Sequence, residues 1–353
     1  MKRPLSLVLV ALTSVMCAAL VVTPAMRAQT VERERVVASN LDTPWGLTFF
    51  ADGRAWVSER DTGLIKEINP RLPAGRNVRT VAKIAGVQPS GEGGLLGIAL
   101  SNSESELYVY YTARADNRVV RIPITGGKLG RQTVIVSGIP KNTYHNGGRI
   151  LVRPDGRLFI ATGDAGDPEL SQQPRSLAGK ILLVDRRGKA VGSSRVFSSG
   201  HRNVQGLALD TRGQLWATEF GSKDADELNL IRRGKNYGWP LFEGVSSDPR
   251  YVSPQAVWSP TSTASPSGLA IKNNVAYVAS LRGEVLWQVP LSGVNTPAPR
   301  AGKPVALNVG DLGRLRTIAT APNGSLWLSS SNTDGRGDPA RTDDRMYQLQ
   351  VIN

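Results

Sequence analysis

The feature that most constrains how this chain can fold is an internal repeat. Each copy has a small residue, an apolar segment, a turn with Asp-Gly, Asn-Gly or a similar pair, a second apolar segment and then a third. The equivalent positions lie 51, 51, 58, 62 and 49 residues apart, and they are Gly46, Gly97, Gly148, Gly206, Gly268 and Thr317. Short apolar segments bounded by turn residues predict β-strands.

Six copies of such a unit predict an all-β fold, a six-bladed β-propeller of four-stranded antiparallel blades. One blade cannot bury its own faces, whereas a closed ring of blades can. Residues 35–38 could supply the outer strand of the last blade and so join the two ends of the chain. Two separate β-sandwiches are the alternative, but no linker interrupts the spacing. We therefore expect one propeller domain over residues 29–353.

The N-terminus has the pattern of an export signal. Lys2 and Arg3 precede an apolar run over residues 5–22, and small residues then offer cleavage after Ala25 or Ala28. We therefore expect a signal peptide over residues 1–28 and a periplasmic or secreted protein. An uncleaved leader would be a membrane anchor, because the run is about long enough to cross a bilayer.

The cysteine content and the net charge limit the kinds of site and partner that this chain can have. Cys17 is the only cysteine, so removal of the leader would leave neither a disulfide nor a thiolate metal site. The net charge is +14, but no run of lysines and arginines is interleaved with aromatic residues. We therefore expect no nucleic-acid partner. A small anionic ligand held by a few arginines is compatible with this charge.

The two histidines of the chain both precede strand-like segments. His145 lies among glycines before an apolar run that ends near residue 160, and Asp164 follows that run. A carboxylate that fixes one imidazole nitrogen leaves the other free to take a proton, so the pair is a candidate general base and its orienting group. A capping or core histidine is the alternative interpretation. His201 occupies a similar loop one repeat later.

In a propeller, the loops before the innermost strands converge at one mouth of the central channel. Seven polar residues of this chain lie beside expected innermost strands, and they are Glu92, His145, His201, Arg202, Asn203, Arg314 and Arg316. We expect them to face one pocket, as a binding or catalytic site requires.

The motifs around these residues resemble those of the soluble pyrroloquinoline quinone (PQQ)-dependent sugar dehydrogenases, the aldose sugar dehydrogenase and soluble glucose dehydrogenase family. The matching stretches follow the family order over most of the chain, and they are PWGL (44–47), GEGGLL (91–96), HNGGR (145–149), GD (163–164), LAGKI (177–181), GHRNVQGL (200–207), EFG (219–221), DELNLI (226–231) and GKNYGWP (234–240). The GHRN and NYGWP segments are the most specific of these.

The resemblance implies roles for individual residues. His145 is expected to take the proton from the anomeric hydroxyl of a sugar while hydride passes to PQQ, and Asp164 is expected to orient it. Arg202 and Asn203 are expected to contact the cofactor, with Arg202 stabilising negative charge on its reduced oxygens. Glu92 is expected to face the substrate or the cofactor.

The resemblance also implies contacts to the cofactor acids and to Ca²⁺. Arg314 and Arg316 match a pair that meets the PQQ carboxylates, and Arg282 lies at about the place of another basic contact. Backbone carbonyls near Gly221 and Ser222 are expected to hold the calcium ion that binds the quinone.

A second, structural calcium is implied at Glu227, through its carboxylate, and at Tyr237, through its backbone. The resemblance has departures as well. Glu92 replaces a glutamine, Tyr144 replaces an acidic residue and Ser222 replaces a proline of the family. Tyr144 argues against glucose as the substrate, and loops shorter than those of the glucose enzyme favour a broad aldose preference.

The sequence thus predicts a quinoprotein that oxidises the anomeric carbon of aldose sugars to lactones and passes electrons to an unidentified acceptor. A calcium-dependent propeller lactonase is one alternative, but it would need carboxylate and amide side chains converging on an axial metal. A noncatalytic propeller that binds sugars or proteins is another, and it would leave His145, Asp164 and Arg202 without a shared task.

Overall fold

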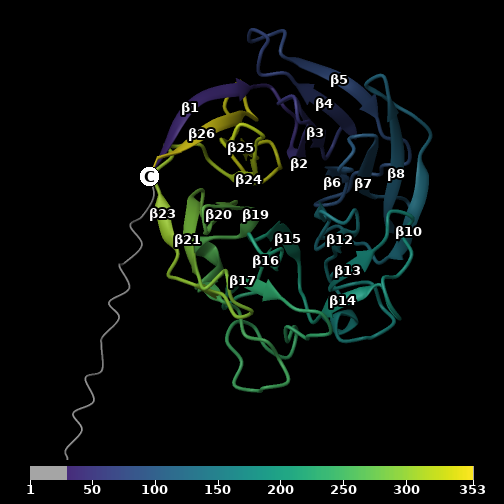
Figure 1. The fold of residues 1–353 in the computed structure, drawn as a ribbon, viewed down its shortest axis with the longest axis vertical. Coiled ribbons are helices and arrows are strands. Elements are labelled where there is room, and N and C mark those ends of the chain that lie inside the picture. Colours follow the sequence, from purple (N-terminus) through teal and green to yellow (C-terminus); the bar gives the residue numbers. More distant parts are fainter. Residues whose placement is uncertain (1–29, 353) are drawn as a thin grey trace, which may run out of the picture.

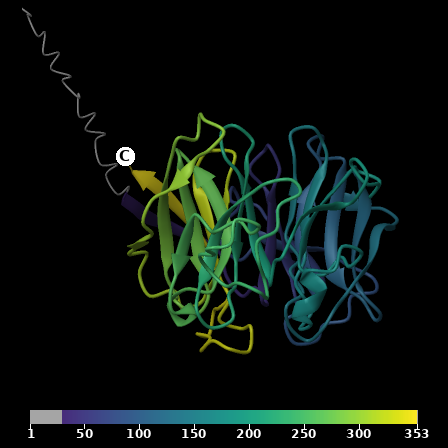
Figure 2. The ribbon, with the colours of Figure 1, turned by 90° about the horizontal axis from the view of Figure 1, so that it is seen from below.

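Six antiparallel β-sheets surround a central axis in the computed structural model, which describes residues 30–352 (Figure 1). The sheets are the blades of a propeller, and the side view shows them standing next to one another with their strands roughly along the axis (Figure 2). The predicted all-β, six-bladed fold is therefore confirmed. The predicted signal peptide, residues 1–28, lies outside the described residues.

The blades follow one another along the chain, each running from its innermost strand outward. The first two blades contain β2 (Pro44–Phe49), β3 (Ala55–Glu59), β4 (Leu64–Ile68) and β5 (Val78–Lys83), then β6 (Leu95–Leu100), β7 (Glu106–Thr112), β8 (Asn117–Thr125), β9 (Lys128–Leu129) and β10 (Thr133–Ile139). The next two contain β11 (Ile150–Val152), β12 (Leu158–Ala161), β13 (Lys180–Val184) and β14 (Val196–Ser199), then β15 (Val204–Leu209), β16 (Leu215–Glu219), β17 (Asp226–Ile231) and β18 (Ala256–Trp258). The last two contain β19 (Pro266–Lys272), β20 (Val275–Ser280), β21 (Leu286–Ser292), β22 (Arg300–Ala301) and β23 (Val305–Leu307), then β24 (Leu315–Thr320), β25 (Leu326–Ser330), β26 (Met346–Ile352) and β1 (Thr30–Ala38).

The ring is closed by strands from both ends of the chain. β1 pairs antiparallel with β26, in a register that places Val31 opposite Val351 and Val36 opposite Tyr347. The expectation that residues 35–38 form the outer strand of the last blade is confirmed. Closure gives the first and last blades a neighbour on each side, so no blade leaves a face uncovered.

One aromatic residue repeats in the second strand of every blade and fills the space between blades. The six residues are each at most 2% exposed, and they are Trp56, Tyr108, Phe159, Trp216, Tyr277 and Trp327. A large aromatic side chain buries much apolar area, which a short strand needs in order to hold its place. The core therefore lies between the blades, as a ring of apolar clusters around the channel.

The glycines that mark the repeat allow the innermost strands to crowd around the axis. A Cβ on Gly46 would lie 2.8 Å from the backbone of Leu96 and Ile98 in the next blade, and one on Gly97 would lie 2.1 Å from the oxygen of Gly148. No side chain fits at either position. The repeat glycine is thus a consequence of the narrow centre of the ring.

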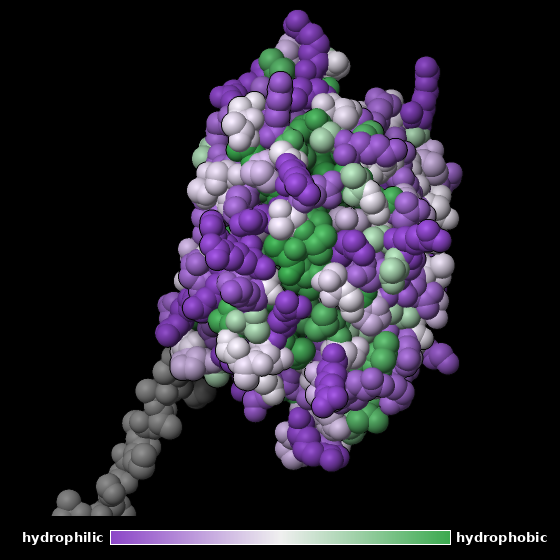
Figure 3. Space-filling view, turned by 90° about the vertical axis from the view of Figure 1, so that its right-hand side faces the viewer, coloured by the Kyte–Doolittle hydropathy of each residue, from purple (hydrophilic) through white to green (hydrophobic). Residues whose placement is uncertain are grey.

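The outer surface is mostly polar. Seen from the side on which β8 and β10 lie in Figure 1, hydrophilic side chains surround a band of hydrophobic ones that runs along the middle (Figure 3). Among residues 30–352, no helix is long and apolar enough to cross a membrane. The helical elements of this part of the chain are two short 3₁₀-helices, η1 (Pro168–Ser171) and η2 (Thr261–Thr263).

Candidate active site

Two connected chambers lie where the loops before the innermost strands converge. The inner chamber has a volume of about 170 Å³ and is lined by Trp45, Gln205 and Arg316 among others. The outer chamber has a volume of about 600 Å³ and is lined by His145, Arg202 and Arg282 among others. They share Glu92, Phe220, Leu281, Arg314 and Arg336. Together they form one cavity at the mouth of the channel.

The structure brings His145 and Asp164 together in the predicted way. The ring atom Nδ1 of His145 lies 2.7 Å from Oδ1 of Asp164, at the end of the β11–β12 hairpin. Asp164 is fully buried, and it also accepts hydrogen bonds from the Gly166 amide at 2.8 Å and from the Trp239 indole at 2.9 Å. A carboxylate can only accept, so Nδ1 carries the proton and Nε2 of His145 is free to act as a base toward the chamber.

Glu92 lies between this pair and the rest of the cavity. Its Oε2 accepts a hydrogen bond from the backbone amide of His145 at 3.1 Å, and its Oε1 forms an ion pair with Arg336 at 2.8 Å. Tyr144 is 42% exposed and meets the His145 ring edge-on, with the centroids 4.7 Å apart. Glu92 therefore fixes the His145 loop and lines both chambers.

Arg202 reaches the outer chamber from the loop before β15. Its guanidinium lies 5.3 Å from the Trp239 ring, its Nη1 donates to the carbonyl of Phe220 at 3.3 Å, and its Nε is buried without a partner among the described residues. Burial lowers the pKa of Arg202. A desolvated guanidinium with an unused donor is suited to an anionic or carbonyl oxygen.

Asn203 and His201 flank Arg202 but line neither chamber. Asn203 is fully buried and its Oδ1 accepts a hydrogen bond from the Gly147 amide at 3.0 Å. His201 is also fully buried, 2.8 Å from a carboxylate oxygen of Glu219, and it stacks on Tyr237. The expectation that His201 faces the pocket is therefore wrong, because this side chain packs behind Arg202 into the fourth blade. The same expectation is wrong for Asn203, whose side chain is buried against the Gly147 amide.

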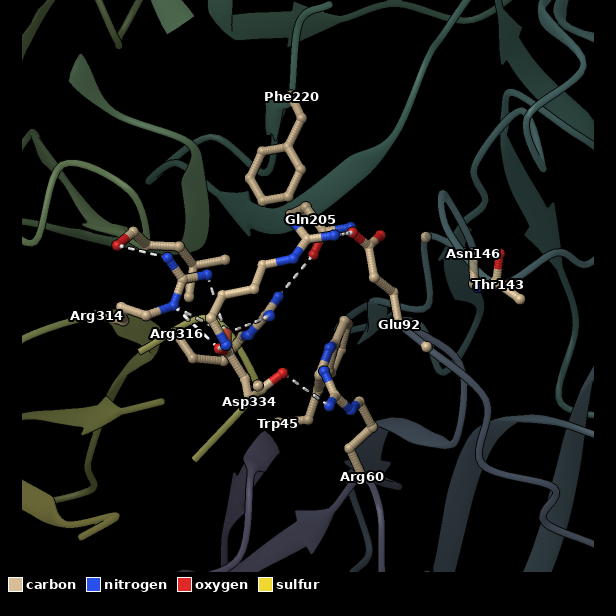
Figure 4. A pocket seen from close by; sticks show the side chains of 15 residues that line it. Trp45, Arg60, Glu92, Thr143, Asn146, Gln205, Phe220, Arg314, Arg316 and Asp334 are labelled. Carbon is tan, nitrogen blue, oxygen red and sulfur yellow. Dashed lines mark hydrogen bonds and ion pairs between the residues drawn. The ribbon is translucent and has the colours of Figure 1, made fainter. Parts of the chain in front are cut away.

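Three charged side chains form the far wall of the cavity. Figure 4 shows Arg314 and Arg316 around Asp334, across the pocket from Glu92. Arg314 holds Asp334 through Nη2 at 3.0 Å, while Arg316 lies 3.8 Å from the same oxygen and donates to Gln205 at 3.1 Å. Burial lowers the pKa of Arg316 to about 10, although Asp334 opposes this shift. The two arginines exceed the single carboxylate, so this wall is net positive.

Arg149 carries a further positive charge near this wall, although it lines neither chamber. Its guanidinium lies 4.3 Å from the Trp45 ring, and that of Arg316 lies 5.9 Å from the same ring. Arg282 is exposed and lines the outer chamber, which leaves it free to meet an anion. Excess guanidinium groups in a secluded cavity favour a ligand that carries carboxylates.

The residues present fit a tricyclic, acidic quinone. The cavity is large enough for a flat ligand, and two buried guanidinium nitrogens of residues that line it lack a hydrogen-bond partner among the described residues, namely Nε of Arg202 and Nε of Arg316. Buried donors without partners are uncommon in folded proteins, and a ligand with acceptor oxygens would satisfy them.

The predicted calcium ligands fall into two groups. Gly221 and Ser222 line the outer chamber, and in residues 30–352 neither of their carbonyl oxygens accepts a hydrogen bond. Glu227 and Tyr237 lie behind them, along a small cavity that Glu219 and Glu243 also line. Burial and the Glu219 carboxylate raise the pKa of Glu227. Free carbonyls and crowded carboxylates are the oxygen ligands that calcium prefers.

Three residues that support the site were not predicted from the sequence. Trp239 bonds Asp164, Lys180 donates to the carbonyls of Leu170, Ser171 and Ala178, and Glu243 accepts from a loop of the outer chamber. Trp239 and Lys180 lie inside the motifs that match the family, which was a signal that they support the site. The sequence carried no such signal for Glu243.

The glucose/sorbosone dehydrogenase family model matches residues 41–338, which include every residue placed at the cavity above. The chain belongs to the glucose/sorbosone dehydrogenase family. The chain is similar to the PQQ-bound aldose sugar dehydrogenase of Streptomyces coelicolor, with 45% identity, a TM-score of 0.85 and coverage of 92% of this chain and 98% of that one.

Two further relatives bear related names. Quinoprotein glucose dehydrogenase B of Acinetobacter calcoaceticus is 29% identical over 62% of this chain and 54% of that protein, so the match spans about half of its length. Aldose sugar dehydrogenase YliI of Escherichia coli is 25% identical over 85% of this chain and 90% of that protein. The predicted family is therefore confirmed.

Proposed function

We propose that this protein is a PQQ-dependent aldose sugar dehydrogenase, which oxidises the anomeric carbon of aldoses to lactones. The observation that carries the proposal is the His145–Asp164 pair at 2.7 Å, facing a chamber of about 600 Å³ rimmed with arginines. Membership of the family and the likeness to a PQQ-bound aldose sugar dehydrogenase support it.

The reaction asks two things of these residues. The bound cofactor would supply the hydride acceptor for the anomeric carbon. Nε2 of His145 takes the proton from the anomeric hydroxyl, because Asp164 holds Nδ1 and so fixes the tautomer. Arg202 stabilises the negative charge that develops on the oxygens nearest to it. Proton and hydride leave the same sugar, so the product is the lactone.

The cofactor would be held by the arginine wall. Arg314, Arg316 and Arg282 would meet its carboxylates, and Glu92 would contact the substrate or the cofactor edge. Asn203 would support the wall through Gln205, which bonds both Asn203 and Arg316. The carbonyls of Gly221 and Ser222 would hold a calcium ion, and Glu227 with the backbone of Tyr237 would hold a second. A calcium ion at the first position would supply Lewis-acid polarisation.

A lactonase is the second candidate class. Its chemistry would need carboxylate and amide side chains that converge on one axial ion. Among residues 30–352, no group of three or more His, Cys, Asp or Glu side chains is arranged to hold a metal ion. No observation favours the lactonase, or a noncatalytic sugar-binding or protein-binding propeller, over the dehydrogenase.

The leader supports a working place outside the cytoplasm. We propose that residues 1–28 direct export, that residues 29–353 form the single catalytic domain, and that the mature protein is periplasmic or secreted. Oxidation of an aldose to a lactone would transfer two electrons to the cofactor. An electron acceptor must therefore reach the cavity mouth.

The decisive experiment is reconstitution of purified apoprotein with PQQ and calcium, followed by absorbance and by aldose-dependent dye reduction. We expect a changed cofactor spectrum and dye reduction in wild type, and a bound cofactor without dye reduction in His145→Ala. Reduction by His145→Ala at the wild-type rate would defeat the mechanism. Lactone hydrolysis without quinone would identify a lactonase, and neither activity would identify a binding protein.

A further inference from the structure

The loop between β16 and β17 presents the two backbone carbonyls proposed to hold calcium, yet it lies largely at the surface. Ser222, Lys223 and Asp224 are exposed, and Gly221 is half-buried. An exposed loop of this kind has many accessible conformations, so a backbone metal site on it needs an anchor.

The anchor is a single oxygen of Glu243, which lies 18 residues or more further along the chain. Oε1 of Glu243 accepts hydrogen bonds from four successive backbone amides, at 2.6, 2.9, 2.9 and 3.1 Å. The donors are Ser222, Lys223, Asp224 and Ala225. Amides that converge on one carboxylate form a nest whose partial positive charge favours the anion.

The geometry of the peptide unit connects this anchor to the carbonyls. In a trans peptide, the C=O of one residue points opposite to the N–H of the next. The Ser222 amide points at Glu243, so the Gly221 carbonyl points away from it. The Lys223 amide also points at Glu243, so the Ser222 carbonyl points away from Glu243 as well. Both residues line the outer chamber, so Glu243 fixes the direction of two oxygens that it does not touch.

The loop is fitted to Glu243 closely. A Cβ on Gly221 would lie 2.5 Å from Oε1 of Glu243 and 2.0 Å from the oxygen of Ala225, so no side chain fits there. A proline at position 222 would lack the amide that makes the shortest of the four bonds. The next residue, Gly244, donates its amide to Glu227 at 2.8 Å, which ties the anchor to the second proposed calcium position.

We propose that Glu243 is a positioning residue that holds the Gly221 and Ser222 carbonyls in place for the calcium ion beside the quinone. This inference rests on the proposed function. Asp224 provides a matched control, because it carries the same charge on the same loop and its side chain is exposed.

The test compares wild type, Glu243→Ala, Glu243→Gln and Asp224→Asn in two measurements. The first is hydrogen exchange at the amides of residues 222–225 in apoprotein. The second is the calcium concentration that gives half-maximal binding of PQQ, followed by absorbance at fixed PQQ. We expect Glu243→Ala to lose protection at these amides and to need about tenfold to 100-fold more calcium, as outer-shell changes at metal sites do.

The other variants separate positioning from charge. Glu243→Gln keeps one acceptor oxygen, so it should stay within about threefold of the wild-type midpoint, and Asp224→Asn should match wild type. A Glu243→Ala protein that loses amide protection but keeps the wild-type midpoint overturns the inference, and so does an equal loss in Asp224→Asn. If wild type binds no PQQ at any calcium concentration, the proposed function is refuted instead.

Discussion

Replacing Asp164 by asparagine should disable the proposed base, because the site has no place for an amide nitrogen. Oδ1 of Asp164 accepts from Nδ1 of His145 and from the Gly166 amide, and Oδ2 accepts from the Trp239 indole. Every neighbour of this carboxylate is thus a donor. An asparagine of the same shape must turn its NH₂ group toward one of them.

Both orientations of that amide have a calculable cost. With NH₂ toward Trp239, two donors face each other in a buried site, which costs about 1–3 kcal/mol. With NH₂ toward His145, Nδ1 must accept and Nε2 carries the proton, so the ring cannot act as a base; the equivalent tautomer error in a serine protease costs about 10⁴ in kcat. We therefore expect kcat of Asp164→Asn to fall by about 10²-fold to 10⁴-fold.

The assay is aldose-dependent dye reduction by protein reconstituted with PQQ and calcium, with cofactor binding measured separately by absorbance. Asp167→Asn is the matched control, because Asp167 is exposed in the same loop and its side chain does not contact His145. Binding of PQQ should be unchanged in both variants. A kcat for Asp164→Asn within about threefold of wild type would refute the reasoning, because about 0.6 kcal/mol is less than one lost hydrogen bond to a charged group.

Three further changes test other parts of the site. Trp239→Phe removes the indole donor to Asp164 and should lower kcat, measured by dye reduction, about tenfold. A wild-type kcat would show that this hydrogen bond does not contribute to catalysis. Lys180→Met removes a donor from three carbonyls and leaves that of Ala178 with no other donor among the described residues, so it should lower the free energy of unfolding by about 3 kcal/mol in urea titration, whereas exposed Lys189→Met should change it little. Burial raises the pKa of Asp226 to about 7, above its usual value near 3.9, so between these pH values the folded calcium-free protein binds the extra proton and loses stability as pH rises. Wild type should therefore lose on the order of 3 kcal/mol more than Asp226→Asn from pH 4 to pH 8, and a constant difference between them would contradict the assigned cause.

The repeat, the strands and the closing strand at the N-terminus could be predicted because each depends on local sequence. An inner-strand glycine, a turn and an aromatic second strand recur in nearly every blade, and the length of the repeat leaves few other folds. The His145–Asp164 pair was also within reach of the sequence. His145 precedes a short β-hairpin and Asp164 follows it, and antiparallel pairing brings the two ends of a hairpin together.

The directions of side chains and the anchoring of loops were decided only by the tertiary structure. His201 and Arg202 are adjacent in sequence, yet Arg202 faces the cavity while Glu219 and Tyr237 draw His201 into the blade. Glu243 shares no motif with the loop it holds. The sequence alone determines which elements form, because strand and turn preferences are local, whereas contacts between distant segments depend on how the whole ring packs.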